Sequence, residues 1–482
     1  MKGLLTGLIF LLTVSTAIAQ SKREDIYSDF VFYQKRVALE KDLRERMIGR
    51  NFLLPLDSNT EDKYLSACWA VSQFLFDSPE VLQGFTTLFG GYDSLTYDTK
   101  KALLEAVYAV APRQYIPAME AVLEKEGDPK LFAMAAVYLY RRDSTTEKGN
   151  ALKIQMVEKF PGYDTVAILQ ELQNYLSYHT AFAQHRTPAI PALFAWQRTV
   201  GQKVIYSFQR WDRDYPGLAV IQDADGHFVR DGQGRLLLFE QLARSGSDLP
   251  YFITNGSTPQ GIYSIQGTDV SRTNFIGPTP NLQLLLPFES GWVRYFQQPQ
   301  DTIAGRPTGA SGADAGMTTG FRANKQTGQA GAMKTVDSVV GAGPGQPPLP
   351  ERQQDPGIDS LNSYLELLPP VWRDYTPMME AWTAGKIGRT EIIAHGTTID
   401  PEYYSGKPFY PLTPTMGCLC AKELWNPTSG HLLVSEQFNL VSAFLSTGGR
   451  KGYLYVINVD DQHKPVSRAE IEGWVRQWEG RK

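Results

Sequence analysis

Residues 391–420 carry a thiol and an imidazole that together could perform nucleophilic chemistry. A short apolar run at residues 392–394 precedes His395, and a loop rich in Pro, Tyr and Thr then leads to Cys418. An imidazole has a pKa suited to taking the proton of a thiol near neutral pH, which turns the thiol into a nucleophile. Gly417, just before the thiol, lets a carbonyl group approach and leaves backbone N–H groups to face a developing oxyanion. The pattern predicts acyl transfer through a cysteine.

Three segments of the chain resemble the active-site signature of the L,D-transpeptidase (YkuD-type) family. His395-Gly396 at a strand end matches the first part of that signature. Its second part, Ser/Thr-His-Gly-Cys followed by a hydrophobic residue, is matched at Thr415, Gly417, Cys418 and Leu419. Upstream, residues 258–265 read TPQGIYSI and are similar to the family's Thr-Pro-x-Gly-x-Phe/Tyr-x-Ile segment. The segments come in the family's order, and the resemblance covers only the C-terminal part of the chain.

Two positions depart from the family's pattern. Met416 stands where the family usually has a second His, and Cys420 stands where it usually has Arg or Asn. The spacer between His395 and Thr415 is also longer than usual. These departures leave the nucleophile and the base in place, and they affect the substrate contacts that the resemblance implies.

The resemblance implies a reaction and a substrate. The enzyme would attack a peptidoglycan stem peptide at the bond between an L-centre and a D-residue, form a thioester, and pass the acyl group to an amine as a 3-3 cross-link. Such a transferase serves cell-wall biogenesis and cell shape. No metal and no organic cofactor is expected. The implied catalytic residues are Cys418, His395 and Gly417, and the implied substrate-binding residues are Tyr263, Thr415 and Gly396.

Three other interpretations fit the same residues. Water could replace the amine, which gives an L,D-carboxypeptidase. A zinc site could form from Cys418, Cys420, His395 and His431, although a Cys-x-Cys pair is seldom used alone. The departures at Met416 and Cys420 also fit a catalytically impaired protein that binds cell wall and acts as an envelope scaffold.

The N-terminal residues read as a secretory signal. Lys2 supplies a charged start, residues 4–14 form an apolar core, and residues 17–19 (AIA) form a cleavage site. The alternative is an uncleaved anchor helix. A second long apolar run is absent from the sequence, so no further membrane span is expected. The sequence therefore predicts export to a periplasm.

Composition narrows the classes of function. A net charge of −4 and a pI near 6.0 do not indicate the excess of positive charge that is typical of nucleic-acid-binding proteins. Three cysteines in an exported chain do not make a disulfide framework, and Cys418 and Cys420 are too close for an easy bridge. Cys68 lies in an apolar helical pattern and is expected to be buried. An unpaired thiol in an oxidising compartment favours Cys418 as a nucleophile.

The expected fold class is α+β, with an all-helical N-terminal domain that has features of a helical repeat, followed by a mostly β catalytic domain. The helical domain either docks another envelope protein or positions glycan, or it simply packs against the catalytic domain. The expected divisions are a signal peptide (1–19), a helical domain (20–185), the first part of the catalytic domain (186–300), a low-complexity insertion (301–357), and the second part with the active-site loop (358–482).

Local signals mark individual elements. Asp128 before Pro129 predicts a helix start, Asp98 predicts a cap for the helix that follows it, and Ser467 with Glu470 predicts a capping box. Residues 186–208, with two prolines and Trp196, are interpreted as a connector. Apolar runs predict strands or buried segments at residues 218–221, 262–265, 282–286, 292–296 and 453–459.

Overall fold

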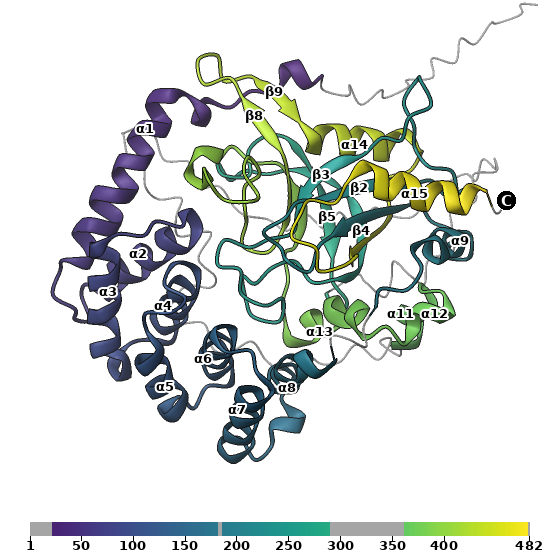
Figure 1. The fold of residues 1–482 in the computed structure, drawn as a ribbon. Coiled ribbons are helices and arrows are strands. Elements are labelled where there is room, and N and C mark those ends of the chain that lie inside the picture. Colours follow the sequence, from purple (N-terminus) through teal and green to yellow (C-terminus); the bar gives the residue numbers. More distant parts are fainter. Residues whose placement is uncertain (1–21, 182–185, 290–360, 481–482) are drawn as a thin grey trace, which may run out of the picture.

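The computed structural model describes residues 22–181, 186–289 and 361–480. Its C-terminal half is organised around a closed sheet with the spatial strand order β1-β10-β4-β5-β6-β7-β3-β2, in which β2 pairs again with β1 (Figure 1). The strands are β1 (Val204–Gln209), β2 (Gly217–Gln222), β3 (Phe239–Leu242), β4 (Gly261–Val270), β5 (Pro280–Leu285), β6 (Ile393–His395), β7 (Leu419–Ala421) and β10 (Gly452–Asn458). The expectation of a helical N-terminal region followed by a sheet is confirmed at this level.

Two neighbouring pairs in the closed sheet run parallel, and the other pairs run antiparallel. One parallel pair is β1 with β10; the other is β6 with β7, where Ala394 lies opposite Leu419 and His395 lies opposite Cys420. Parallel neighbours need a long crossover connection. Between β6 and β7 that connection is the loop that joins the predicted base, His395, to the predicted nucleophile, Cys418.

The helices of the N-terminal half begin where the local sequence allows them to begin. Asp128 accepts hydrogen bonds from the N–H groups of Lys130 and Leu131, with Pro129 at the first helical position, as predicted. The cap predicted at Asp98 is wrong, because Thr96 accepts from Thr99 there. The helices are α1 (Tyr33–Lys41), continued by a π-helical stretch η3 (Asp42–Arg50), α2 (Glu61–Phe74), α3 (Pro79–Gly90), α4 (Tyr97–Val110), α5 (Ile116–Lys125), α6 (Pro129–Arg142), α7 (Thr146–Lys159) and α8 (Ala167–Ala181).

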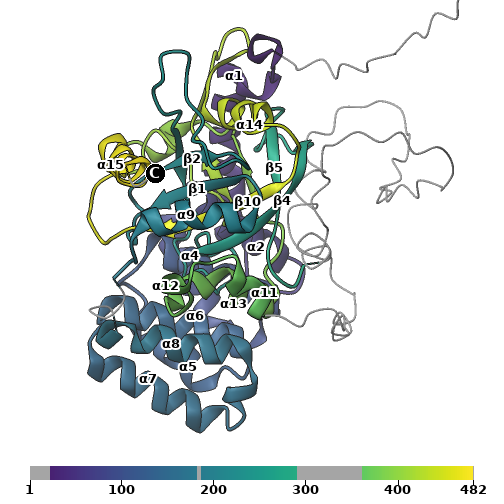
Figure 2. The same cartoon turned by 90° about the vertical axis from the view of Figure 1, so that its right-hand side faces the viewer.

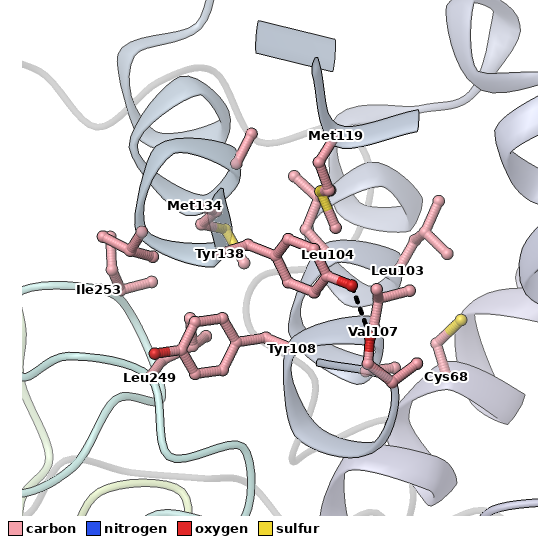
Figure 3. Packing of buried hydrophobic residues seen from close by; sticks show 14 of the residues in the cluster. Cys68, Leu103, Leu104, Val107, Tyr108, Met119, Met134, Tyr138, Leu249 and Ile253 are labelled. Carbon is pink, nitrogen blue, oxygen red and sulfur yellow. Dashed lines mark hydrogen bonds between the residues drawn. The ribbon is translucent and has the colours of Figure 1, made fainter. Parts of the chain in front are cut away.

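These helices form an arc around the closed sheet (Figure 1). Their buried apolar side chains continue without a break into loops of the C-terminal half, since Leu249, Ile253 and Phe409 belong to the same core cluster as the helices. Figure 3 shows Leu249 and Ile253 beside Tyr108, Met134 and Tyr138, whose hydroxyl donates to the carbonyl of Ala111 at 2.6 Å. The helical half therefore packs directly on loops of the C-terminal half.

A second group of helices covers the sheet elsewhere. Residues 186–208, interpreted above as a connector, instead contain α9 and all but the last residue of β1, so that prediction is wrong. Pro191 lies in the first turn of α9, where its missing N–H costs nothing. Figure 2 shows α13 between the sheet and α8. The group comprises α9 (Ile190–Val200), α11 (Leu361–Glu366), α12 (Pro370–Arg373), α13 (Glu380–Ile387), α14 (Glu436–Ser446) and α15 (Arg468–Glu479).

The first described residues reach across to the C-terminal half. The pair β8 (Glu423–Trp425) and β9 (Leu432–Ser435) forms a small separate sheet. Ile26 and Val31 pack against Trp425 and Leu432 in a small apolar cluster there. The first described residues are thus anchored on the β8–β9 pair of the C-terminal half.

Several sequence predictions lie outside the described residues: the signal peptide at 1–19, the run at 292–296 and the insertion at 301–357. Within the described ranges, no helix has the length and apolar character needed to cross a membrane.

Candidate functional site

His395 ends β6 and is held by the backbone that follows it. Its Nδ1 lies 2.5 Å from the carbonyl oxygen of Gly396. A carbonyl only accepts, so Nδ1 carries the proton and Nε2 is left with a lone pair. Burial lowers the pKa of His395 to about 4, because the charged ring would lose its hydration. The imidazole is therefore neutral at pH 7, with Nε2 able to accept a proton.

Cys418 directly precedes β7 and is half-buried. Its Sγ accepts from the N–H of Ile393 at 3.5 Å, and its S–H faces the carbonyl oxygen of Glu391 at 3.6 Å. Burial raises the pKa of the Cys418 thiol to about 11. The ground state consequently holds a thiol and not a thiolate.

The sheet register places the two predicted groups at neighbouring parallel strands. His395 lies opposite Cys420 in the parallel pair, and Cys418 is two residues before Cys420. Residues opposite each other in a parallel register share a face of the sheet, as His395 and Cys420 do. Cys418 precedes β7, and its Sγ contacts the N–H of Ile393, at the other end of β6 from His395. The hydrogen bonds of Cys418 Sγ go to the β6 backbone and not to the His395 ring. His395 therefore ends β6, whereas Cys418 lies just before the start of the neighbouring β7, and among the described residues no hydrogen bond joins their side chains.

Thr415 shapes the turn that presents Cys418. Its Oγ1 accepts from the N–H of Gly417 at 3.0 Å and donates to the carbonyl of Cys418 at 2.8 Å. The prediction that the Gly417 N–H faces an oxyanion needs correction, because Thr415 already engages that donor. The N–H of Cys418 lies before β7 begins, and among the described residues it has no hydrogen-bond acceptor. It is the backbone donor that remains for an oxyanion.

Arg389 is a residue of the site that the sequence did not single out. Gly388 ends α13 in the left-handed conformation, and the chain then turns Arg389 beneath the Cys418 loop. Its guanidinium donates to the carbonyls of Ser257 and Gly256 at 3.1 and 3.0 Å, and also to that of Tyr251. Burial lowers the pKa of Arg389 to about 10, while the nearby Tyr263 and Cys418 oppose that shift.

Gly417 is where this packing is tightest. Its φ is +115°, and a Cβ built there would lie 2.3 Å from Nη2 of Arg389. Only glycine fits this position, since the conformation and the space both exclude a side chain. A buried cation below a nucleophile loop was not visible in the sequence, because Arg389 lies outside the three family-like segments.

Glu423 on β8 is the second residue that sequence reasoning missed. Its carboxylate accepts from the N–H of Thr397 at 2.8 Å and from the Ser435 hydroxyl at 2.6 Å. Burial raises the pKa of Glu423 to about 8. Glu423 fixes the backbone directly after His395 and thereby positions the imidazole.

The remaining predicted site residues occupy structural positions. Tyr263 has no exposed surface, and its hydroxyl donates to the carbonyl of Pro259 at 2.7 Å. Gly396 and Thr415 act through the backbone and the turn described above. Cys420 is buried beside His395, and Met416 is half-buried. The structure therefore places Tyr263 in the core of the closed sheet and not on a surface that a substrate reaches.

The zinc interpretation finds no support in the described ranges. No group of three or more His, Cys, Asp or Glu side chains there is arranged to hold a metal ion. His431 lies against the ring of Tyr27, with ring centroids 5.6 Å apart.

Comparison of the chain with protein-family models, with curated proteins and with solved structures gave no match. The residues and their geometry are thus the basis for assigning a function.

Proposed function

We propose that this protein is an exported, periplasmic cysteine acyltransferase of the L,D-transpeptidase type. Its substrates would be peptidoglycan stem peptides, and it would need neither a metal nor an organic cofactor. The observation that carries the proposal is the hydrogen bond from Nδ1 of His395 to Gly396, which leaves Nε2 as a base on β6, the strand whose Ile393 N–H contacts Sγ of Cys418.

In the first half-reaction the thiol hydrogen leaves the carbonyl of Glu391 and passes to Nε2 of His395. The sulfur attacks the carbonyl carbon of the stem peptide, and the N–H of Cys418 donates to the oxyanion. The intermediate then breaks its C–N bond, His395 returns the proton to the leaving amine, and a thioester remains. Because thiol and imidazole are neutral beforehand, proton transfer accompanies the attack.

In the second half-reaction an acceptor amine attacks the thioester. His395 takes a proton from that amine and gives it to the departing sulfur, which restores the thiol. Attack by water in place of the amine would give the L,D-carboxypeptidase with the same residues.

One observation favours a second candidate, a catalytically impaired cell-wall-binding protein. The thiol of Cys418 faces the Glu391 carbonyl, and burial raises its pKa to about 11, so the nucleophile is not activated in this state. An enzyme must break that contact in every cycle, whereas a scaffold would keep it.

Intact-mass spectrometry with a carbapenem separates these candidates, because the family's active Cys is acylated by such compounds. We expect one adduct per chain in the wild type and in Cys420→Ala, and none in Cys418→Ala. His395→Asn should form the adduct more slowly. An adduct that survives in Cys418→Ala, or its absence in the wild type, would favour the scaffold.

Muropeptide analysis then identifies the reaction. Incubation with disaccharide-tetrapeptides followed by chromatography and mass spectrometry should yield 3-3 linked dimers. Tripeptides without dimers would establish the carboxypeptidase.

A further inference from the structure

We infer that a cavity between the helical half and the closed sheet binds a short, uncharged oligosaccharide. The cavity has a volume of about 740 Å³, which lies within the range of small-molecule pockets. Helices α4, α6 and α8 line one side, and α13 with loops that flank the strands lines the other. Figure 2 shows α8 and α13 facing each other at this place. Cys418 and His395 are not among the lining residues, so the cavity is separate from the candidate active site.

Aromatic rings form a large part of the lining. They come from five positions that are far apart in sequence: Tyr108, Tyr140, Tyr175, Trp211 and Tyr251. Aromatic faces combine a broad apolar surface with few rotatable bonds. Sugar rings present flat C–H faces that stack on such surfaces. Tyr108 and Tyr140 are buried, so the half-buried rings of Tyr175, Trp211 and Tyr251 are the ones that suit this contact.

The charged side chains of the lining include both signs: two arginines, at 141 and 213, and three carboxyl groups, at 171, 248 and 380. Arg141 pairs with Asp248 at 3.3 Å and lies over the ring of Tyr108 at 4.6 Å. The hydroxyl of Tyr251 donates to Glu171. With cations and carboxylates both present, the cavity carries no dominant sign that would select a phosphate or a polyamine.

The carboxyl groups of the cavity are poorly hydrated. Burial raises the pKa of Glu380 to about 8, and it also raises the pKa of Glu171 and Asp248. Glu380 accepts from the N–H of Gln260 at 2.8 Å, so each of the three carboxyl groups has a protein partner. A lipid chain offers no hydrogen-bonding atoms to these polar walls, whereas sugar hydroxyls both donate and accept.

The cavity shares a wall with the nucleophile loop. Ser257 and Thr258 line the cavity. On their other side, Thr258 Oγ1 donates to the carbonyl of Gly417 at 3.0 Å, and the Ser257 carbonyl accepts from Arg389 at 3.1 Å. A bound sugar chain would therefore lie directly behind the loop that presents Cys418. Sugar binding itself does not require the thiol or the proposed acyl transfer.

Isothermal titration calorimetry with chitotetraose, an uncharged β-1,4-linked chain of N-acetylglucosamine, tests the inference on the purified protein. We expect saturable binding to one site. Trp211→Ala and Tyr175→Ala should each weaken it at least tenfold. Tyr97→Ala is the matched aromatic control, because Tyr97 is exposed on α4 and does not line the cavity.

A third variant, Asn174→Arg, tests the cavity without removing a large side chain from the core. Asn174 lines the cavity from an exposed position, so the arginine should fill part of the cavity and leave the fold intact. It too should weaken binding, with an unchanged thermal denaturation curve. Cys418→Ala should bind chitotetraose as the wild type does, which keeps this test independent of the acyltransferase proposal. No binding, or binding that none of the three cavity variants changes, would overturn the inference.

A competition experiment tests the class of ligand. A charged stem tetrapeptide without sugar should not displace chitotetraose. Displacement that depends on Trp211 would identify the cavity as a peptide site and overturn the oligosaccharide assignment.

Discussion

The carboxyl group of Glu423 lies against the α-carbon of Gly396, so no side chain fits beside His395. A Cβ built at Gly396 would fall 2.1–2.3 Å from the carboxyl atoms of Glu423. The same carboxylate holds the N–H of Thr397. A buried acid on β8 thereby fixes the backbone whose carbonyl orients the imidazole on β6.

Gly396→Ala should destabilise the protein and impair the site. The added methyl must displace a buried carboxyl, and overpacking of this kind costs about 1–3 kcal/mol. Urea unfolding should show this loss, and carbapenem acylation should slow at least tenfold. Gly473→Ala in α15 is the matched control, because a Cβ there meets nothing within 4 Å and helical Ala is favoured over Gly by about 0.5–1 kcal/mol. Wild-type stability in Gly396→Ala would contradict the packing described here.

The stability of the protein should fall as the pH rises from about 4.5 to 8, in part because of Glu423. Its pKa is raised from 4.5 to about 8 in the folded state, so across this window the folded chain keeps a proton that the unfolded chain has lost. The slope of unfolding free energy with pH is then negative.

Glu423→Gln mimics the protonated acid and should reduce that decline by on the order of 1–3 kcal/mol between pH 5 and 9. Urea unfolding of both proteins at several pH values measures the difference. Parallel curves for the two proteins would show that Glu423 is ionised in the folded state.

Alkylation of Cys418 should be slow at neutral pH. Its pKa is raised from 9.0 to about 11, which lowers the thiolate fraction at pH 7 roughly 100-fold relative to an unperturbed thiol. The iodoacetamide rate at Cys418, followed by mass spectrometry, should rise about tenfold per pH unit from pH 7 to 10. The buried Cys68 and Cys420 serve as internal references and should stay unmodified in the native protein. A rate that is already maximal at pH 7 would reveal a preformed thiolate.

Thr415→Val should slow acylation while Thr415→Ser should not. Valine keeps the shape of threonine but loses both hydrogen bonds of Oγ1, to the Gly417 N–H and the Cys418 carbonyl. Each is worth about 0.5–1.5 kcal/mol, so the valine variant should be less stable by about 1–3 kcal/mol. Thermal unfolding together with carbapenem acylation measures both effects. Equal acylation rates for the two variants would show that the turn does not depend on the hydroxyl.

Local sequence predicted the elements whose signals lie within one turn or one strand. Asp128 and Ser467 cap their helices as expected, and the aromatic and β-branched residues of 453–459 form all but the first residue of β10 and extend one residue past it. It failed at residues 186–208, where prolines suggested a connector but Pro191 instead lies in the first turn of α9. The prediction also failed at Asp98, because Thr96, two residues earlier, is the N-cap of α4.

The sequence by itself determined which groups could do chemistry: His395 at a strand end, Cys418 after a glycine, and the turn residue Thr415. Tertiary structure alone decided that Arg389 and Glu423 support them, that Thr415 takes the Gly417 N–H, and that Tyr263 is buried. Capping and strand patterns act between near neighbours along the chain, so the sequence displays them. Burial, pKa shifts and the shared core of the two halves arise from contacts between distant segments, which no local pattern encodes.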